Sequence, residues 1–167
     1  MADAKVLVVM GSDSDFPVME GCFKMLNKFG VGFKATVASA HRTPDKAMSL
    51  ARNAEAEGFK VIIAAAGLAA HLGGVLAANT ALPVIGVPCK GGALAGVDAL
   101  YATVQMPTGI PVATVAIDGA ANAAILACQM IAIRDGELRA KLAEYKEELK
   151  SSVDAKDAAL KEKIANI

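Results

Sequence analysis

Five short apolar runs recur along the chain, at residues 5–10, 33–38, 61–66, 84–87 and 112–117. In the first run the hydrophobic positions are continuous rather than alternating, which is typical of a strand buried on both faces of a parallel sheet. Segments with helical signals follow the runs. The repeated order of strand and helix predicts an α/β protein, a three-layer α/β/α sandwich with a central parallel sheet.

Proline and glycine mark the ends of the first two predicted helices. The segment 16–29 has Pro17 in its first turn and Gly30 just past its end, as helices commonly do. The segment 44–57 begins with a proline and ends before a glycine. Thr43 is expected to be its N-cap.

The last part of the chain has a different character. A helix is predicted from about residue 118 to 133, and after residue 135 the chain is charged and helical. We therefore predict a single domain, 1–167, in which 135–167 is a C-terminal helical extension. Its apolar positions have helical spacing and need a partner, within the subunit or on a neighbouring one; they are Leu138, Leu142, Tyr145, Leu149 and Val153.

The loop at 39–44, Ser-Ala-His-Arg-Thr-Pro, joins the second strand to the second helix. Loops of this kind lie at the carboxyl ends of parallel strands, where ligands bind. Arg42 can pair with a phosphate, and His41 carries an imidazole that can exchange a proton near neutral pH. The alternative is that His41 packs or caps and Arg42 is only solvated.

The loop after the first strand, Gly-Ser-Asp-Ser-Asp at 11–15, opens a helix. Its amide groups and hydroxyls suit a phosphate, and Asp15 suits a ribose hydroxyl. It lacks both the dinucleotide-binding and the P-loop glycine patterns, so neither a dinucleotide nor an ATP site is indicated. The alternative is that Asp13 and Asp15 only cap the helix.

The loop after the third strand, residues 67–74, is neutral and made largely of small residues, which let a flat ligand approach the backbone. Close packing between helix and strand explains the same composition. His71 in this loop is one of two histidines, and a structural role is the simpler expectation for it. The loops after the first three strands should meet at one edge and bring together Ser12, Asp15, Ser39, His41, Arg42 and Gly67.

Composition narrows the possible partners and setting. Of 167 residues, 54% are hydrophobic, and the formal net charge is zero, which argues against a nucleic-acid partner. Three unclustered cysteines fit a reducing compartment and show no metal-site spacing. The first five residues lack the basic region of a secretory leader, so we expect a cytoplasmic protein. Residues 61–89 carry no charge, but glycines, a histidine and a proline interrupt them, so we expect no membrane span.

Taken together, five segments resemble the signatures of class I PurE, the 5-(carboxyamino)imidazole ribonucleotide mutases of bacterial purine synthesis. The resemblance covers roughly residues 5–133, with the segments in the family's order and spacing. It implies a flavodoxin-like sheet and a homo-oligomer, typically an octamer, whose C-terminal helix reaches a neighbouring subunit. The segments are 10–15, 39–44, 66–72, 82–88 and 105–112.

The resemblance also implies an isomerase that needs no metal, ATP or other cofactor and acts on a small ribonucleotide. The carboxylate on the exocyclic amine of the imidazole moves to ring carbon C4 by decarboxylation and recarboxylation. His41 matches the general acid/base, and Gly67 with its neighbours lines the pocket for the base and CO2. The remaining positions implied in substrate binding are Ser12, Ser14, Asp15, Ser39, Arg42, Ala66 and His71.

Leu68 stands where the family usually has glycine, and Gly73 where it usually has proline. Two alternative functions remain. A class II enzyme would carboxylate aminoimidazole ribonucleotide directly with CO2, but that class typically carries lysine at the position of Arg42 and lacks the Arg-Thr-Pro sequence. A non-catalytic nucleotide-binding module would keep Ser12, Asp15 and Arg42 but would not need His41.

Overall fold

A computed structural model describes residues 4–167. The first three residues, where we expected no secretory leader, lie outside this described part. None of the helices within residues 4–167 combines the length and the apolar character needed to cross a bilayer.

Five parallel strands form one sheet with the order β2-β1-β3-β4-β5. This order confirms the predicted parallel, flavodoxin-like sheet. The strands are β1 (Ala4–Met10), β2 (Gly32–Val37), β3 (Val61–Gly67), β4 (Val84–Cys89) and β5 (Ala113–Thr114).

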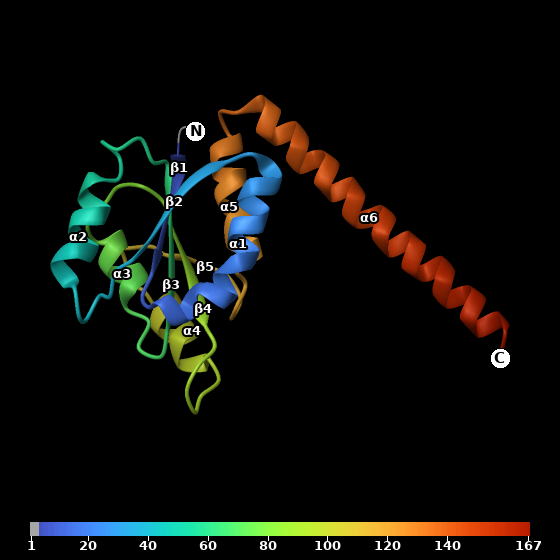
Figure 1. Ribbon diagram of the computed structural model, residues 1–167, viewed down its shortest axis with the longest axis horizontal. Coiled ribbons are helices and arrows are strands. Elements are labelled where there is room, and N and C mark those ends of the chain that lie inside the picture. The colour runs from blue at the N-terminus through green and yellow to red at the C-terminus, as the bar shows by residue number, and fades with distance from the viewer. Residues whose placement is uncertain (1–3) are drawn as a thin grey trace.

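Helices cover both faces of the sheet, which confirms the three layers (Figure 1). On one face α1 and α5 pack together, and on the other lie α2 and α3, with α4 close to β4 and β5. The helices are α1 (Phe16–Phe29), α2 (Pro44–Asn53), α3 (Leu72–Ala77), α4 (Val97–Val104), α5 (Ala120–Ala132) and α6 (Gly136–Ala165), with a short 3₁₀ helix, η1 (Asp13–Asp15), before α1.

The strand β1 shows why the apolar run is continuous. Successive side chains of a strand point to opposite faces, so Val6 and Val8 enter the core beneath α1 and α5. Leu7 and Val9 enter the core beneath α2 and α3. All four are at most 1% exposed, because both faces of this strand are covered.

The bounds of α1 match the prediction, with Gly30 closing the helix in the left-handed conformation at φ 71°. The second helix is shorter than predicted, because it ends at Asn53 and the chain turns through residues 54–58. This turn delivers Phe59, which is 3% exposed, into the core. Thr43 does not cap α2 through its side chain, contrary to the prediction.

The predicted fifth strand, 112–117, is reduced to the two residues of β5. The chain still follows β4 beyond them through single hydrogen bonds, from the amide of Val115 to the carbonyl of Gly86 and from Asp118 to Pro88. The strand β5 lies at the edge of the sheet and pairs with β4 alone. In contrast, β4 runs two residues past its predicted end, to Cys89.

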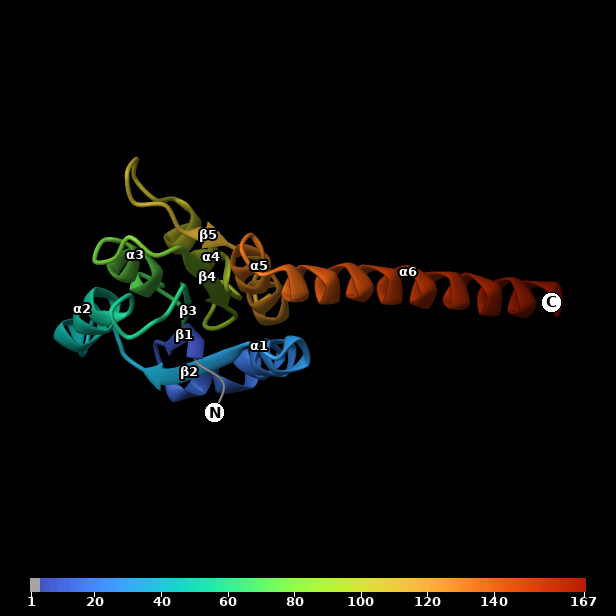
Figure 2. The same ribbon diagram turned by 90° about the horizontal axis from the view of Figure 1, so that it is seen from above.

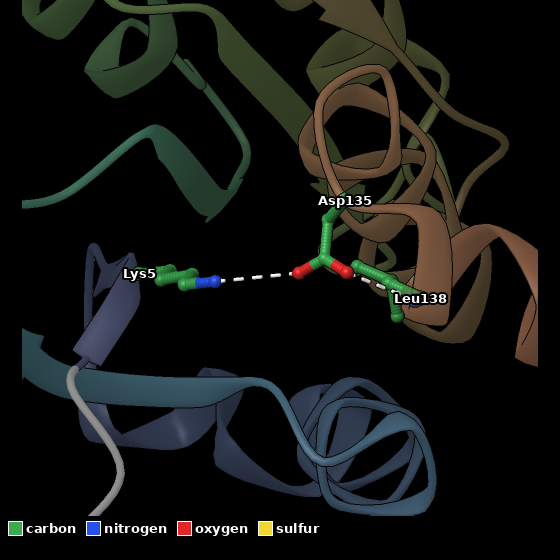
Figure 3. A network of polar contacts seen from close by, with 3 residues as sticks. All are labelled: Lys5, Asp135 and Leu138. Atoms are coloured by element: carbon green, nitrogen blue, oxygen red, sulfur yellow. Dashed lines mark hydrogen bonds and ion pairs between the residues drawn. The ribbon is translucent and has the colours of Figure 1, made fainter.

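Helix α6 begins beside the amino ends of the strands and extends away from the rest of the chain (Figures 1 and 2). Lys5 of β1 and the amide of Leu138 both bind the Asp135 carboxylate, at 3.4 Å and 3.0 Å (Figure 3). Leu138 and Leu142 are buried, whereas residues 146–167 are exposed. The first turns of α6 are therefore fixed to the domain, and Tyr145 and Glu148 further along still contact Phe29 and Lys28 of α1. Within residues 4–167, no ion pair or aromatic contact joins the helix to the sheet or its covering helices beyond Glu148.

Candidate active site

A cavity of about 620 Å³ opens at the carboxyl ends of the strands. The segments that follow β1, β2, β3 and β4 line it. This is the edge at which open parallel sheets bind their ligands. Most of its polar residues lie on the segments after β1 and β2, and the segment after β3 is apolar, so we describe the two sides of the cavity in turn.

The loop after β1 is folded by its own side chains. The amide of Ser12 donates to Asp15 Oδ2 at 3.0 Å, and the amide of Ser14 donates to Ser12 Oγ at 3.3 Å. This reciprocal capping box begins η1. Asp15 is only 9% exposed, and this burial raises the pKa of its carboxyl group. The alternative of helix capping is thus partly realised, because Asp15 caps η1, although its side chain does not cap α1.

The loop after β2 is held in the same manner. The amide of Arg42 donates to Ser39 Oγ at 3.1 Å, and the amide of Ser39 donates to Thr43 Oγ1 at 2.9 Å. The Thr43 hydroxyl therefore shapes this loop instead of capping α2. The guanidinium of Arg42 reaches the loop after β1 and donates to the carbonyl of Gly11 at 3.4 Å. Its other N–H groups remain available to an anion.

The two histidines meet at this edge. His41 Nε2 lies 2.9 Å from His71 Nδ1, and the rings meet nearly edge to face at 74°. One of these two nitrogens must donate and the other accept, so the two rings cannot both be imidazolium ions while the bond persists. While the bond persists, the pair can carry at most one proton more than two neutral rings do. His71 is thus hydrogen-bonded, as the structural expectation for it allows, and its partner is the other histidine.

The other side of the cavity is apolar. Ala66, Gly67 and Leu68 line it from β3 and the following loop, and Cys89 lines it from the end of β4. A side chain at Gly67 would begin 3.2 Å from the carbonyl oxygen of Cys89, so these two strand ends are in close contact. Burial raises the pKa of Cys89 to about 12. The residue is thus a neutral thiol in the wall rather than a nucleophile.

The structure brings the predicted residues together. Other than His71, all the predicted substrate-binding and catalytic residues line the cavity directly: Ser12, Ser14, Asp15, Ser39, His41, Arg42, Ala66 and Gly67. His71 is placed through its bond to His41. The sequence analysis did not assign Cys89 and Lys90 to the site, although both follow β4 and so reach the same edge.

Lys90 is fixed by a contact that only the fold creates. Its backbone amide donates to Asp118 Oδ1 at 2.8 Å, across 28 positions of sequence. Asp118 itself has a left-handed backbone conformation, with φ 58°.

Within residues 4–167, no group of three or more His, Cys, Asp or Glu side chains is arranged to hold a metal ion.

Comparison with known proteins gives a consistent result. The family model described as AIR carboxylase matches residues 5–152. N5-carboxyaminoimidazole ribonucleotide mutase of Pyrococcus horikoshii is 52% identical over 155 residues, which cover 93% of this chain and 88% of that protein. The mutase of Thermotoga maritima is also 52% identical, over 149 residues that cover 89% and 87% of the two chains.

Similarity extends to a longer protein and to solved structures. Phosphoribosylaminoimidazole carboxylase of Candida glabrata is 52% identical over 92% of this chain, but the match covers only 27% of that protein. The crystal structure of Treponema denticola PurE superposes with a TM-score of 0.86 at 30% identity, covering 95% of this chain and 99% of that one.

Proposed function

The chain belongs to the AIR carboxylase family, and from this premise we infer that it is an isomerase of purine biosynthesis. It converts 5-(carboxyamino)imidazole ribonucleotide into 4-carboxy-5-aminoimidazole ribonucleotide. Relatives that carry the mutase name match this chain over most of their own length as well. The observation that supports this function most directly is the position of His41, in a cavity with one polar and one apolar side.

We propose that the polar side holds the phosphate and ribose. Ser12, Ser14 and Ser39 offer hydroxyls, and Arg42 offers an unpaired part of its guanidinium to the phosphate. Asp15 accepts from a ribose hydroxyl through the part of its carboxylate not bound to Ser12. The apolar side, with Ala66 and Gly67, then receives the imidazole and the CO2.

We propose that His41 moves the proton in both halves of the reaction. When the carbamate C–N bond breaks, its electron pair goes to the exocyclic nitrogen, which takes a proton from His41, and CO2 leaves as a neutral molecule. Ring carbon C4 then attacks CO2, and the proton of C4 returns to His41. Because His71 holds Nε2 of His41, Nδ1 is the nitrogen that exchanges this proton, and the cycle consumes none.

The test is to supply the carboxyamino nucleotide in one reaction, and aminoimidazole ribonucleotide with bicarbonate in another, both without ATP. We expect rapid conversion of the carboxyamino nucleotide only. Efficient use of the uncarboxylated nucleotide with CO2 would instead establish a direct carboxylase, the activity that the Candida glabrata relative is named for. Binding of the nucleotide without turnover in either reaction would favour a non-catalytic module.

We further propose a homo-octamer in which the extension 135–167 packs on a neighbouring subunit. An isolated helix is marginal in water, yet α6 continues for 20 residues beyond Tyr145 and carries Leu149 and Val153, which are 50% and 63% exposed. Light scattering should give the mass of eight chains. Replacing Leu149 and Val153 by serine should lower this mass, whereas replacing Lys150 by serine should not. A monomeric wild-type protein would contradict the proposal.

We also propose that the protein works in the cytoplasm. Cys22, Cys89 and Cys128 are all free and buried, which suits a reducing compartment. Cell fractionation tests this location.

A further inference from the structure

The cavity contains a cationic side chain, Lys90, that takes no part in the proposed phosphate, ribose and proton contacts. Lys90 directly follows β4, lines the cavity and is exposed. Its ammonium group forms no ion pair with an acidic side chain of residues 4–167, Asp118 included. The other Lys or Arg in the described lining is Arg42, which is assigned to the phosphate. A positive charge is therefore available to a second anionic group of the nucleotide.

The backbone of Lys90 is held in place from two sides. Its amide donates to Asp118 Oδ1 at 2.8 Å, and the amide of Asp118 donates to the carbonyl of Pro88 at 2.9 Å. A Cβ on Gly96 would stand 3.0 Å from the Cα atom of Lys90, so the loop after β4 folds back closely onto this residue. The start of the lysine side chain is therefore fixed relative to the strand ends, while the ammonium group keeps the reach of its flexible stem.

The strand order places Lys90 at the end of the cavity away from the phosphate contacts. The guanidinium of Arg42 contacts Gly11, just after β1, and β1, β3 and β4 are consecutive in the sheet. At the usual spacing of about 4.8 Å between strands, β4 lies roughly 10 Å from β1. Gly67, on the side proposed for the imidazole, pairs with Cys89, the residue before Lys90. A nucleotide with its phosphate at Arg42 therefore directs its base toward Lys90.

The substrate and the product both carry a carboxylate at the base end, and aminoimidazole ribonucleotide lacks it. We propose that Lys90 pairs with this carboxylate, and that the site thereby selects the carboxylated nucleotides over aminoimidazole ribonucleotide. The carboxylate moves only from the exocyclic nitrogen to the neighbouring ring carbon. A compact ammonium group on a flexible stem can follow it between these positions. This inference rests on the proposed function.

The pairing predicts an effect on binding rather than on the chemical step. When the carboxylate leaves as neutral CO2, its ion pair with Lys90 is lost. The ammonium group therefore stabilises the bound substrate and the bound product, but not the state between them. Removing its charge should raise KM for the carboxyamino nucleotide without lowering kcat.

The experiment measures two affinities by calorimetry, in buffer without bicarbonate: that for 4-carboxy-5-aminoimidazole ribonucleotide and that for aminoimidazole ribonucleotide. Their ratio is the preference for the carboxylated nucleotide. We expect Lys90→Gln to lower this preference about tenfold by weakening the carboxylated complex alone. Lys90→Arg, which keeps the charge, should retain most of it. Lys60→Gln is the matched control, because Lys60 precedes β3 at the amino ends of the strands and does not line the cavity.

A second measurement needs no variant. In the wild-type protein the preference should fall as potassium chloride is added, because salt screens an exposed ion pair. An unchanged preference in Lys90→Gln would overturn the proposal. An equal loss of affinity for both nucleotides would also overturn it, because Lys90 would then act on the phosphate. These outcomes leave the mutase assignment intact, because wild-type turnover is measured separately. A wild-type protein that forms no product from the carboxyamino nucleotide would remove the proposed function, and this inference with it.

Discussion

The two ends of the sheet use charged side chains in different ways. At the amino end, Lys5 and Asp135 pair at 3.4 Å and fix the start of α6 (Figure 3). At the carboxyl end, Arg42 forms no ion pair with an acidic side chain of residues 4–167, and its guanidinium contacts only a carbonyl oxygen. Charges at one end are satisfied within the fold, whereas at the other they are available to a ligand.

Asp15 at the carboxyl end and Asp135 at the amino end show the same difference between the two ends of the sheet. Both carboxylates accept a backbone amide at the start of a helix, Asp15 from the third position of η1 and Asp135 as the N-cap of α6. Burial raises the pKa of Asp15. The amide of Leu138, followed by Lys5, lowers the pKa of Asp135. Both carboxylates accept an amide, so the opposite directions of their pKa shifts come from solvation and neighbouring charge. Only for Asp15, in the cavity, does the fold disfavour the ionised form.

The largest change should follow from His41→Asn. Removing a general acid/base typically slows turnover about 10²–10⁴-fold, while the phosphate and ribose contacts remain. We expect kcat to fall in that range and the affinity for the nucleotide product to change little, as measured by steady-state kinetics and calorimetry. Turnover close to that of the wild type would exclude His41 from this role.

His71→Asn is the matched variant for His41→Asn. His71 acts on the substrate through His41, so its loss should reduce kcat by less and should alter the pH profile of kcat. An unchanged pH profile would mean that the 2.9 Å bond between the two rings does not govern the proton on His41.

Arg42→Ala should have the next largest effect, and on binding rather than on the chemical step. A hydrogen bond to a charged group contributes about 1.5–3 kcal/mol, so affinity for the nucleotide should fall roughly 10- to 100-fold by the usual conversion. Arg52→Ala is the control, because Arg52 binds Asn79 at 3.0 Å and does not line the cavity. Equal affinities for Arg42→Ala and the wild type would contradict the proposed phosphate contact.

The smallest effects concern stability, where the two aspartates should differ in sign. The folded-state pKa of Asp135 is lowered, so its contribution is present above the ordinary value of 3.8 and is lost as pH falls through the folded pKa. The folded-state pKa of Asp15 is raised, so its ionised form disfavours folding as pH rises above 3.8. We expect Asp135→Asn to lower Tm at pH 7 by about 2 °C.

Asp15→Asn should leave Tm at pH 7 unchanged or raise it, because an asparagine oxygen can still accept from Ser12. Melting curves of the wild type and both variants between pH 3 and 7 give the comparison. The difference between the wild type and Asp135→Asn should fade in acid. A marked loss of stability in Asp15→Asn at neutral pH would show that its capping bond outweighs its burial.

The sequence predicted elements best where local chemistry decides them. Helix α1 has the expected bounds because Pro17 suits its first turn and Gly30 adopts the left-handed conformation that ends it. Helix α2 was predicted too long because its end is decided by the burial of Phe59, a tertiary requirement. Thr43 was assigned to a cap because its type and position allowed one, but the Ser39 loop offered its hydroxyl a competing partner.

The sequence by itself determined the buried strands, the order of strands and helices, and the loops that carry the chemistry. Only the tertiary structure decided which loops touch: His41 meets His71 across 30 positions, and Leu68 rests on Gly92. Strand and helix patterns arise from side chains a few positions apart, so a sequence displays them directly. Contacts between loops depend on strand order and register, which are fixed when both faces of the sheet are buried together.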